Sequence, residues 1–177
     1  DEYVFKEIRP SYNMLDIQEG DTVLDIGANI GAFSLYATQE GAEKVYSYEP
    51  DEDNFELLNV NSPNSVNTRC AVVGDDSDYV YLYVNSKKNK GLHMTREVRG
   101  RDAVKVLALK FDDIIQQTKP NKIKIDVEGA EYGFMPYVFP DYVEKLVMEI
   151  HFQYDSTWRA KGKELNQSML DQGFKPM

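Results

Sequence analysis

The chain has 177 residues, with 20 lysines and arginines against 30 aspartates and glutamates, a net charge of −10 and a single cysteine, Cys70. This length predicts one domain over residues 1–177, and the negative charge argues against broad binding to nucleic acid or anionic membranes. One cysteine excludes an internal disulfide and a cysteine-rich zinc site. The sequence shows no apolar run of roughly 20 residues and no signal peptide, so we expect no membrane span and a cytoplasmic location.

Apolar strand patterns alternate with amphipathic helix patterns along most of the chain. Strands are predicted at Val23–Ile26, Lys44–Glu49, Thr68–Val73, Ile123–Val127 and Lys145–Ile150. Helices are predicted at Gly31–Thr38, with Asn29 as cap and Gly41 as stop, and at Asp53–Asn59, Phe111–Gln117 and Lys163–Gln172. This order predicts an α/β fold with a mostly parallel sheet covered by helices on both faces.

The middle of the chain follows another pattern. Tyr79–Val84 and Val104–Lys110 alternate between apolar and polar residues, which predicts an antiparallel pair outside the parallel set. Three tyrosines on one face of the first strand fit either the half-buried face of an edge strand or a platform on which a sugar stacks. Exposed edge strands are also compatible with a homo-oligomer.

The strongest motif is a glycine loop between a strand and a helix, VLDIGANIGAFSLYA over residues 23–37. Gly27 and Gly31 permit a tight turn at the carboxyl edge of the sheet, where nucleotide-like ligands bind in this fold class. Glu49 follows Gly27 by 22 positions and can accept hydrogen bonds from a ribose diol. The alternative is a turn that only connects strand and helix.

This loop departs from the dinucleotide fingerprint, because Asn29 stands where a glycine admits the pyrophosphate, and there is no P-loop motif. A ligand with a ribose but no phosphate fits better, and S-adenosylmethionine is such a ligand. Asp25 is predicted to meet its amino-acid portion, directly or through water.

Six segments together resemble the FkbM-type S-adenosylmethionine-dependent methyltransferase family, in order from about residue 20 to residue 151. They read VLDIGANIGAF, VYSYEPDEDNFELLNVN, CAVVGD, LKFDDII, IKIDVEGAE and MEIH. The resemblance implies a Rossmann-like class I methyltransferase fold and O-methylation of a small-molecule, lipid or glycan hydroxyl. The family's sheet ends in an antiparallel strand pair, and we expect this C-terminal pair to be incomplete here.

The resemblance also implies a cofactor site. Glu49 would hold the ribose, Pro50 would flank the adenine, and Cys70 and Ala71 would lie near the adenine edge. Together with the glycine loop and the strand ends, the predicted cofactor-binding residues are Asp25, Gly27, Ala28, Asn29, Gly31, Glu49, Pro50, Cys70, Ala71 and Asp126.

The candidate catalytic residues are Asp126, Glu128 and His151, which follow two predicted strands. We expect His151 to act as general base on an acceptor hydroxyl, with Glu128 or Asp126 orienting it or binding the hydroxyl. In one alternative, His151 is a structural residue whose ring nitrogens are hydrogen-bonded by the backbone alone. In another, the three residues are ligands of a divalent metal, although we predict no metal. Glu131 is expected to face solvent or to cap a helix.

Segment 87–110 is basic in an acidic protein, with eight lysines and arginines against two acids. It indicates either an anionic acceptor held by a lid or a solvated loop. The predicted function is therefore S-adenosylmethionine-dependent O-methylation of a sugar, glycan or other small metabolite. The alternatives are methylation at nitrogen or on nucleic acid, which the charge disfavours, and a non-catalytic relative that acts as a binding module.

Overall fold

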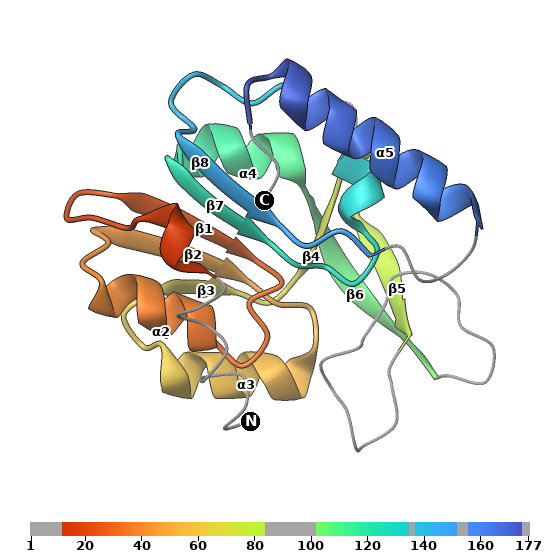
Figure 1. Ribbon diagram of the computed structural model, residues 1–177. Coiled ribbons are helices and arrows are strands. Elements are labelled where there is room, and N and C mark those ends of the chain that lie inside the picture. Colours follow the sequence, from red (N-terminus) through yellow and green to blue (C-terminus); the bar gives the residue numbers. More distant parts are fainter. Residues whose placement is uncertain (1–11, 84–101, 135–136, 152–155, 175–177) are drawn as a thin grey trace.

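The computed structural model describes residues 12–83, 102–134, 137–151 and 156–174 (Figure 1). Its main feature is a five-stranded sheet in the order β3-β2-β1-β7-β8, in which every neighbouring pair is parallel. The strands are β1 (Thr22–Ile26), β2 (Lys44–Tyr48), β3 (Val66–Thr68), β7 (Lys122–Ile125) and β8 (Lys145–Met148). The predicted mostly parallel sheet is confirmed.

Helices cover both faces of this sheet, as predicted (Figure 1). On one face lie α2 (Ala32–Gln39) and α3 (Glu52–Asn61), and on the other lie α4 (Phe111–Thr118) and α5 (Ser156–Asp171). Alternate residues of β1 supply the two cores, because successive side chains of a strand point to opposite faces. Leu24 belongs to the cluster that contains Phe111 of α4, whereas Val23 belongs to the cluster that contains Phe33 of α2.

A second, three-stranded sheet has the order β4-β6-β5, with β4 (Ala71–Val73), β5 (Tyr79–Tyr83) and β6 (Ala103–Lys110). The predicted antiparallel pairing of β5 with β6 is confirmed, but β6 also pairs in parallel with β4. Tyr79 and Tyr81 are 54% and 56% exposed on the edge strand β5, and the Lys105 ammonium lies 4.1 Å from the Tyr79 ring centroid.

Several boundaries differ from the sequence-based expectations. The strand predicted at Thr68–Val73 is two strands in different sheets, because the chain bends at Cys70 between β3 and β4. The N-cap of α2 is Gly31, not Asn29, because the carbonyl of Gly31 accepts the first helical hydrogen bond, from the N–H of Leu35. Helix α5 begins at Ser156, well before the predicted start.

Two short 3₁₀ helices complete the described part of the chain, η1 (Asn13–Leu15) and η2 (Glu131–Phe134). Within the described ranges no strand follows β8, and α5 is the last element. A search of the same residues finds no helix with the length and apolar character that crossing a bilayer requires.

Candidate functional site

The glycine loop between β1 and α2 approaches the end of β7 closely. Gly27 has φ of +78°, and a Cβ atom there would lie 1.8 Å from the carbonyl oxygen of Asp126. The N–H groups of Gly27 and Ala28 both donate to the carbonyl of Tyr48, and that of Gly31 donates to Ala28. Because these donors are engaged within the protein, they do not form a cradle for a phosphate.

Asp25 and Lys124 form a buried ion pair beneath this loop. Their carboxylate and ammonium lie 3.1 Å apart on the neighbouring strands β1 and β7, where the two residues are register partners. Ser34 donates to Asp25, and Lys124 donates to the carbonyl of Gly27 at 2.6 Å. Burial alone would lower the pKa of Lys124, but the charges of Asp25 and Asp126 outweigh it and raise that pKa.

The pair therefore supports the loop from below. Asp25 is fully buried and is not among the residues that line the pocket between Glu49 and Asp126. Its carboxylate therefore has no direct contact with a ligand in that pocket. The sequence carried a signal for this role. Asp25 stands among apolar residues of β1, and Lys124 alternates with isoleucines in β7, and such charges require a partner once they are buried.

Glu49 lies at the end of β2 with only 5% of its surface exposed. One carboxylate oxygen accepts the N–H of Asn29 at 2.8 Å, and the other accepts the N–H of Asp51 at 2.9 Å. Burial raises the pKa of Glu49 to about 7, although these N–H donors and the side chain of Asn54 work in the opposite direction. The carboxylate is thus held rigidly and still has lone pairs available for a ligand.

A pocket runs from Glu49 to the end of β7 and encloses about 620 Å³, part of it open to solvent. Its walls combine apolar and polar groups, which are Ile26, Gly27, Asn29, Tyr48, Glu49, Pro50, Asn54, Cys70, Ala71, Val72, Leu82, Asp126, Val127, Glu128 and Ala130.

Most predicted cofactor residues line this pocket, and Asp25, Ala28 and Gly31 do not. Ala28 and Gly31 form the turn behind it, where a Cβ on Gly31 would lie 2.8 Å from a side-chain carbon of Leu58. Burial raises the pKa of the Cys70 thiol to about 12, so this wall of the pocket is chemically inert.

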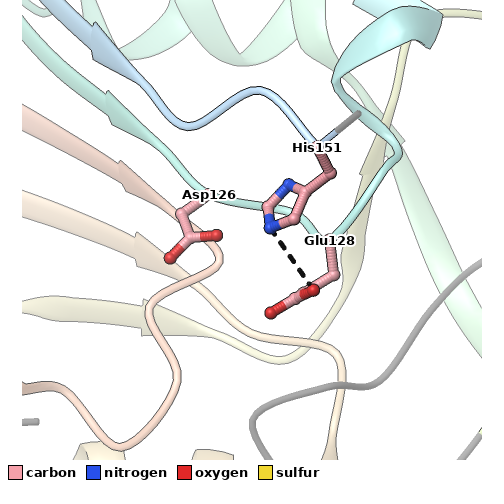
Figure 2. Close-up of side chains that lie close together, drawn as sticks. All are labelled: Asp126, Glu128 and His151. Atoms are coloured by element: carbon pink, nitrogen blue, oxygen red, sulfur yellow. Dashed lines mark ion pairs between the residues drawn. The ribbon is translucent and has the colours of Figure 1, made fainter. Parts of the chain in front are cut away.

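An acid–histidine group formed by Asp126, Glu128 and His151 lies beyond the ends of β7 and β8 (Figure 2), and its members Asp126 and Glu128 line the pocket. One ligand atom from each of the three side chains lies within 4.8 Å of the other two. The Nε2 atom of His151 is 3.4 Å from the Glu128 carboxylate, which itself stands on a left-handed backbone with φ of +50°. The structure therefore brings the predicted catalytic residues together.

Glu131 is the main correction at this site, because it is fully buried and does not face solvent, although it is the first residue of η2. One of its oxygens accepts the backbone N–H of His151 at 2.6 Å and lies 3.3 Å from Nδ1 of the same residue. The other accepts the N–H of Gly129. The sequence carries no sign that this glutamate is buried, and only the fold shows that it lies behind His151.

The charges of this group shift two pKa values. Burial alone would lower the pKa of His151, but the hydrogen bond and charge of Glu131, with the charges of Glu128 and Asp126, raise it to about 9. Burial raises the pKa of Glu128 to about 7 despite the nearby histidine. With these neighbours alone, the imidazole is mostly protonated near neutral pH, and the role of His151 as general base stays a prediction.

Other predicted features fall mainly outside the described residues. The basic segment has only Lys105 and Lys110 within them, and Lys110 pairs with Asp76 at 2.7 Å. The remaining basic residues, from Lys87 to Arg101, lie outside.

Comparison with known proteins identifies the domain type. The model of the methyltransferase FkbM domain family matches residues 25–176, which is most of the chain. None of the curated proteins compared with the chain matches it.

Solved structures show the same fold. The chain is similar to precorrin-6y C5,15-methyltransferase from Geobacter metallireducens, with a TM-score of 0.55 and 12% identity over 96% of this chain and 72% of that one. It is also similar to the C-terminal domain of precorrin-6Y C5,15-methyltransferase from Rhodobacter capsulatus. The TM-score is 0.54 and the identity is 13%, over 97% of this chain and 71% of that one. At these identities the likeness concerns the fold alone. A Thermoplasma acidophilum protein is 28% identical over 38% of this chain but only 34% of its own, with a TM-score of 0.30.

Proposed function

Because the chain belongs to the methyltransferase FkbM domain family, we propose that it transfers a methyl group from S-adenosylmethionine to a hydroxyl of a sugar, glycan or other small metabolite. The observation that carries this proposal is one pocket that is lined both by Glu49 at the end of β2 and by Asp126 and Glu128 of the acid–histidine group. Glu49 suits a ribose diol, and the two other carboxylates suit an acceptor hydroxyl.

The residues present fit S-adenosylmethionine. Glu49 is a rigid carboxylate that can accept ribose hydroxyls, and Pro50, Cys70 and Ala71 offer apolar surface to a base. The glycine loop gives no cradle for phosphates, which favours a nucleoside over a dinucleotide. The bound molecule would supply a methyl group that its sulfonium already activates, so the protein mainly has to align the acceptor with it.

Asp126 and Glu128 line the pocket, and His151 lies behind them. These two carboxylates are thus the members of the group that can accept a hydrogen bond from the acceptor hydroxyl and orient its oxygen. In the transfer, the oxygen–carbon bond forms as the carbon–sulfur bond breaks, the electron pair stays on sulfur, and the hydroxyl proton leaves to a base or to water.

The test is calorimetric binding of S-adenosylmethionine to the whole chain and to two matched variants. Glu49→Gln removes the buried carboxylate charge, whereas Glu52→Gln removes an exposed one nearby that pairs with Arg69. We expect the first substitution to weaken binding about 10- to 100-fold, as for a lost charged hydrogen-bond acceptor worth about 1–3 kcal/mol, and the second to leave it unchanged. Equal affinities in all three chains would refute the assignment of Glu49.

Turnover is then measured as S-adenosylhomocysteine released with neutral sugars, anionic sugars, amines and RNA as acceptors. Product formed with sugars supports the proposal. Product formed only with amines or RNA would contradict the choice of oxygen, and tight cofactor binding without any turnover would favour a binding module.

A further inference from the structure

The acid–histidine group has more negative charge than its one histidine can balance. Besides Glu128, the Glu149 carboxylate lies 3.6 Å from Nε2 of His151, and the Glu131 carboxylate lies 3.3 Å from Nδ1. Lys124 acts on Asp126 through its charge, but its ammonium pairs with Asp25 and donates to Gly27. This excess of carboxylates creates a field that attracts a further cation.

The donor atoms also have the spacing of a metal site. Two donors that each lie about 2.1 Å from one ion are about 3.0–3.4 Å apart at octahedral or tetrahedral angles. His151 and Glu128 are separated by 3.4 Å, and the whole group fits within 4.8 Å, so small side-chain rotations would bring Asp126 into the same set. Figure 2 shows the three side chains turned toward a common point.

Two further observations point to a ligand at this place. The oxygen of Glu128 that faces His151 is buried and makes no hydrogen bond to any described residue, and its 3.4 Å contact with Nε2 of the imidazole is longer than an ordinary hydrogen bond. Glu131, fully buried behind the ring, engages Nδ1 and leaves Nε2 facing the carboxylates. A carboxylate on the far nitrogen is the support that metal-bound histidines generally have.

We propose that Asp126, Glu128 and His151 bind a divalent cation of the Mn²⁺ class, with Glu131 as the positioning residue for the imidazole. One histidine among oxygen donors favours such ions over Mg²⁺. If the proposed function holds, on which this second step rests, the ion coordinates the acceptor's oxygen and eases the loss of its proton. The remaining coordination positions belong to water, to the acceptor or to Glu149.

The experiment titrates Mn²⁺ into the EDTA-treated whole chain and follows free Mn²⁺ by its electron paramagnetic resonance signal. The variants are Asp126→Asn, Glu128→Gln and His151→Gln, and Glu43→Gln serves as control because it removes an exposed carboxylate at the opposite edge of the sheet. We expect one ion per wild-type chain, at least tenfold weaker binding in the three ligand variants, and wild-type binding in the control.

A second measurement reads the coordination of the metal directly in the wild-type complex. Pulsed resonance of the wild-type complex should show nitrogen modulation from a coordinated imidazole, and since the chain has only two histidines, its loss in His151→Gln identifies the ligand. Equal binding in all chains, no binding, or bound Mn²⁺ without nitrogen coupling would overturn the proposal.

The two proposals can fail separately. Binding of S-adenosylmethionine to the EDTA-treated chain without any Mn²⁺ site would refute the metal inference and leave the methyltransferase proposal standing. A Mn²⁺ site in a chain that does not bind S-adenosylmethionine would support the metal inference and refute the methyltransferase proposal.

Discussion

Replacing Gly27 by alanine should cost far more than the same change at another glycine of similar backbone conformation. Gly27 and Gly20 have φ of +78° and +91°, so each alanine incurs the penalty of a left-handed backbone, about 1–2 kcal/mol. The new Cβ at Gly27 would also meet the Asp126 carbonyl oxygen at 1.8 Å, whereas at Gly20 nothing lies within 4 Å. Relief of such a clash adds about 1–3 kcal/mol.

The expected free energies of unfolding are therefore lower by about 2–5 kcal/mol for Gly27→Ala and about 1–2 kcal/mol for Gly20→Ala. Urea denaturation followed by circular dichroism measures both, and in a chain of this size each kcal/mol shifts Tm by about 2–4 °C. Gly27→Ala should also lose affinity for S-adenosylmethionine, because the loop that lines the pocket must move. If both variants lose the same stability, the close approach of the loop to β7 does not exist as described.

Four further outcomes are expected. Lys124→Met leaves Asp25 charged and unpaired in the core, so urea denaturation should show a loss of about 3–5 kcal/mol, partly restored when Asp25→Asn is added. Because burial raises the pKa of Glu49 to about 7, its carboxylate is present above that pH, and calorimetry should show S-adenosylmethionine binding that weakens as the pH falls from 8 to 6; Glu49→Gln should abolish this dependence. Cys70 is 1% exposed, with a pKa raised to about 12 by burial, so a thiol reagent should label it only after denaturation. Asp51→Ala removes the side chain that caps α3 through the N–H of Asn54 and should cost about 1 kcal/mol in the same denaturation assay, whereas an unchanged midpoint would show that the cap contributes nothing.

Short sequence patterns were enough to predict the strands and turns whose conformation depends on neighbouring residues in the chain. The strands β1 and β2 and the turn at Gly27 follow from short apolar runs and from glycines in left-handed conformation. The gathering of Asp126, Glu128 and His151 was also predictable, because parallel neighbouring strands end at one edge.

What depends on neighbours distant in sequence was not predictable. Glu131 reads as a surface acid until the fold places His151 against it. The chain's departure from the main sheet at Cys70 depends on a second sheet, in which β6 pairs with β4. The pKa of His151 follows from three carboxylates that meet only in the folded chain. The role of His151 as general base therefore stays a prediction that residue type alone does not decide.

The ion pair of Asp25 and Lys124 has a consequence for how the strands find one another. Apolar strands attract each other in many alignments, since leucine, isoleucine and valine are nearly interchangeable in their hydrophobic contribution. A shift of β1 against β7 by one residue would place an isoleucine of β7 opposite Asp25 and leave both charges without their partner inside the protein, at a cost of several kcal/mol. The pair thus discriminates against misaligned sheets, and an all-apolar replacement could keep the attraction while losing the single correct alignment.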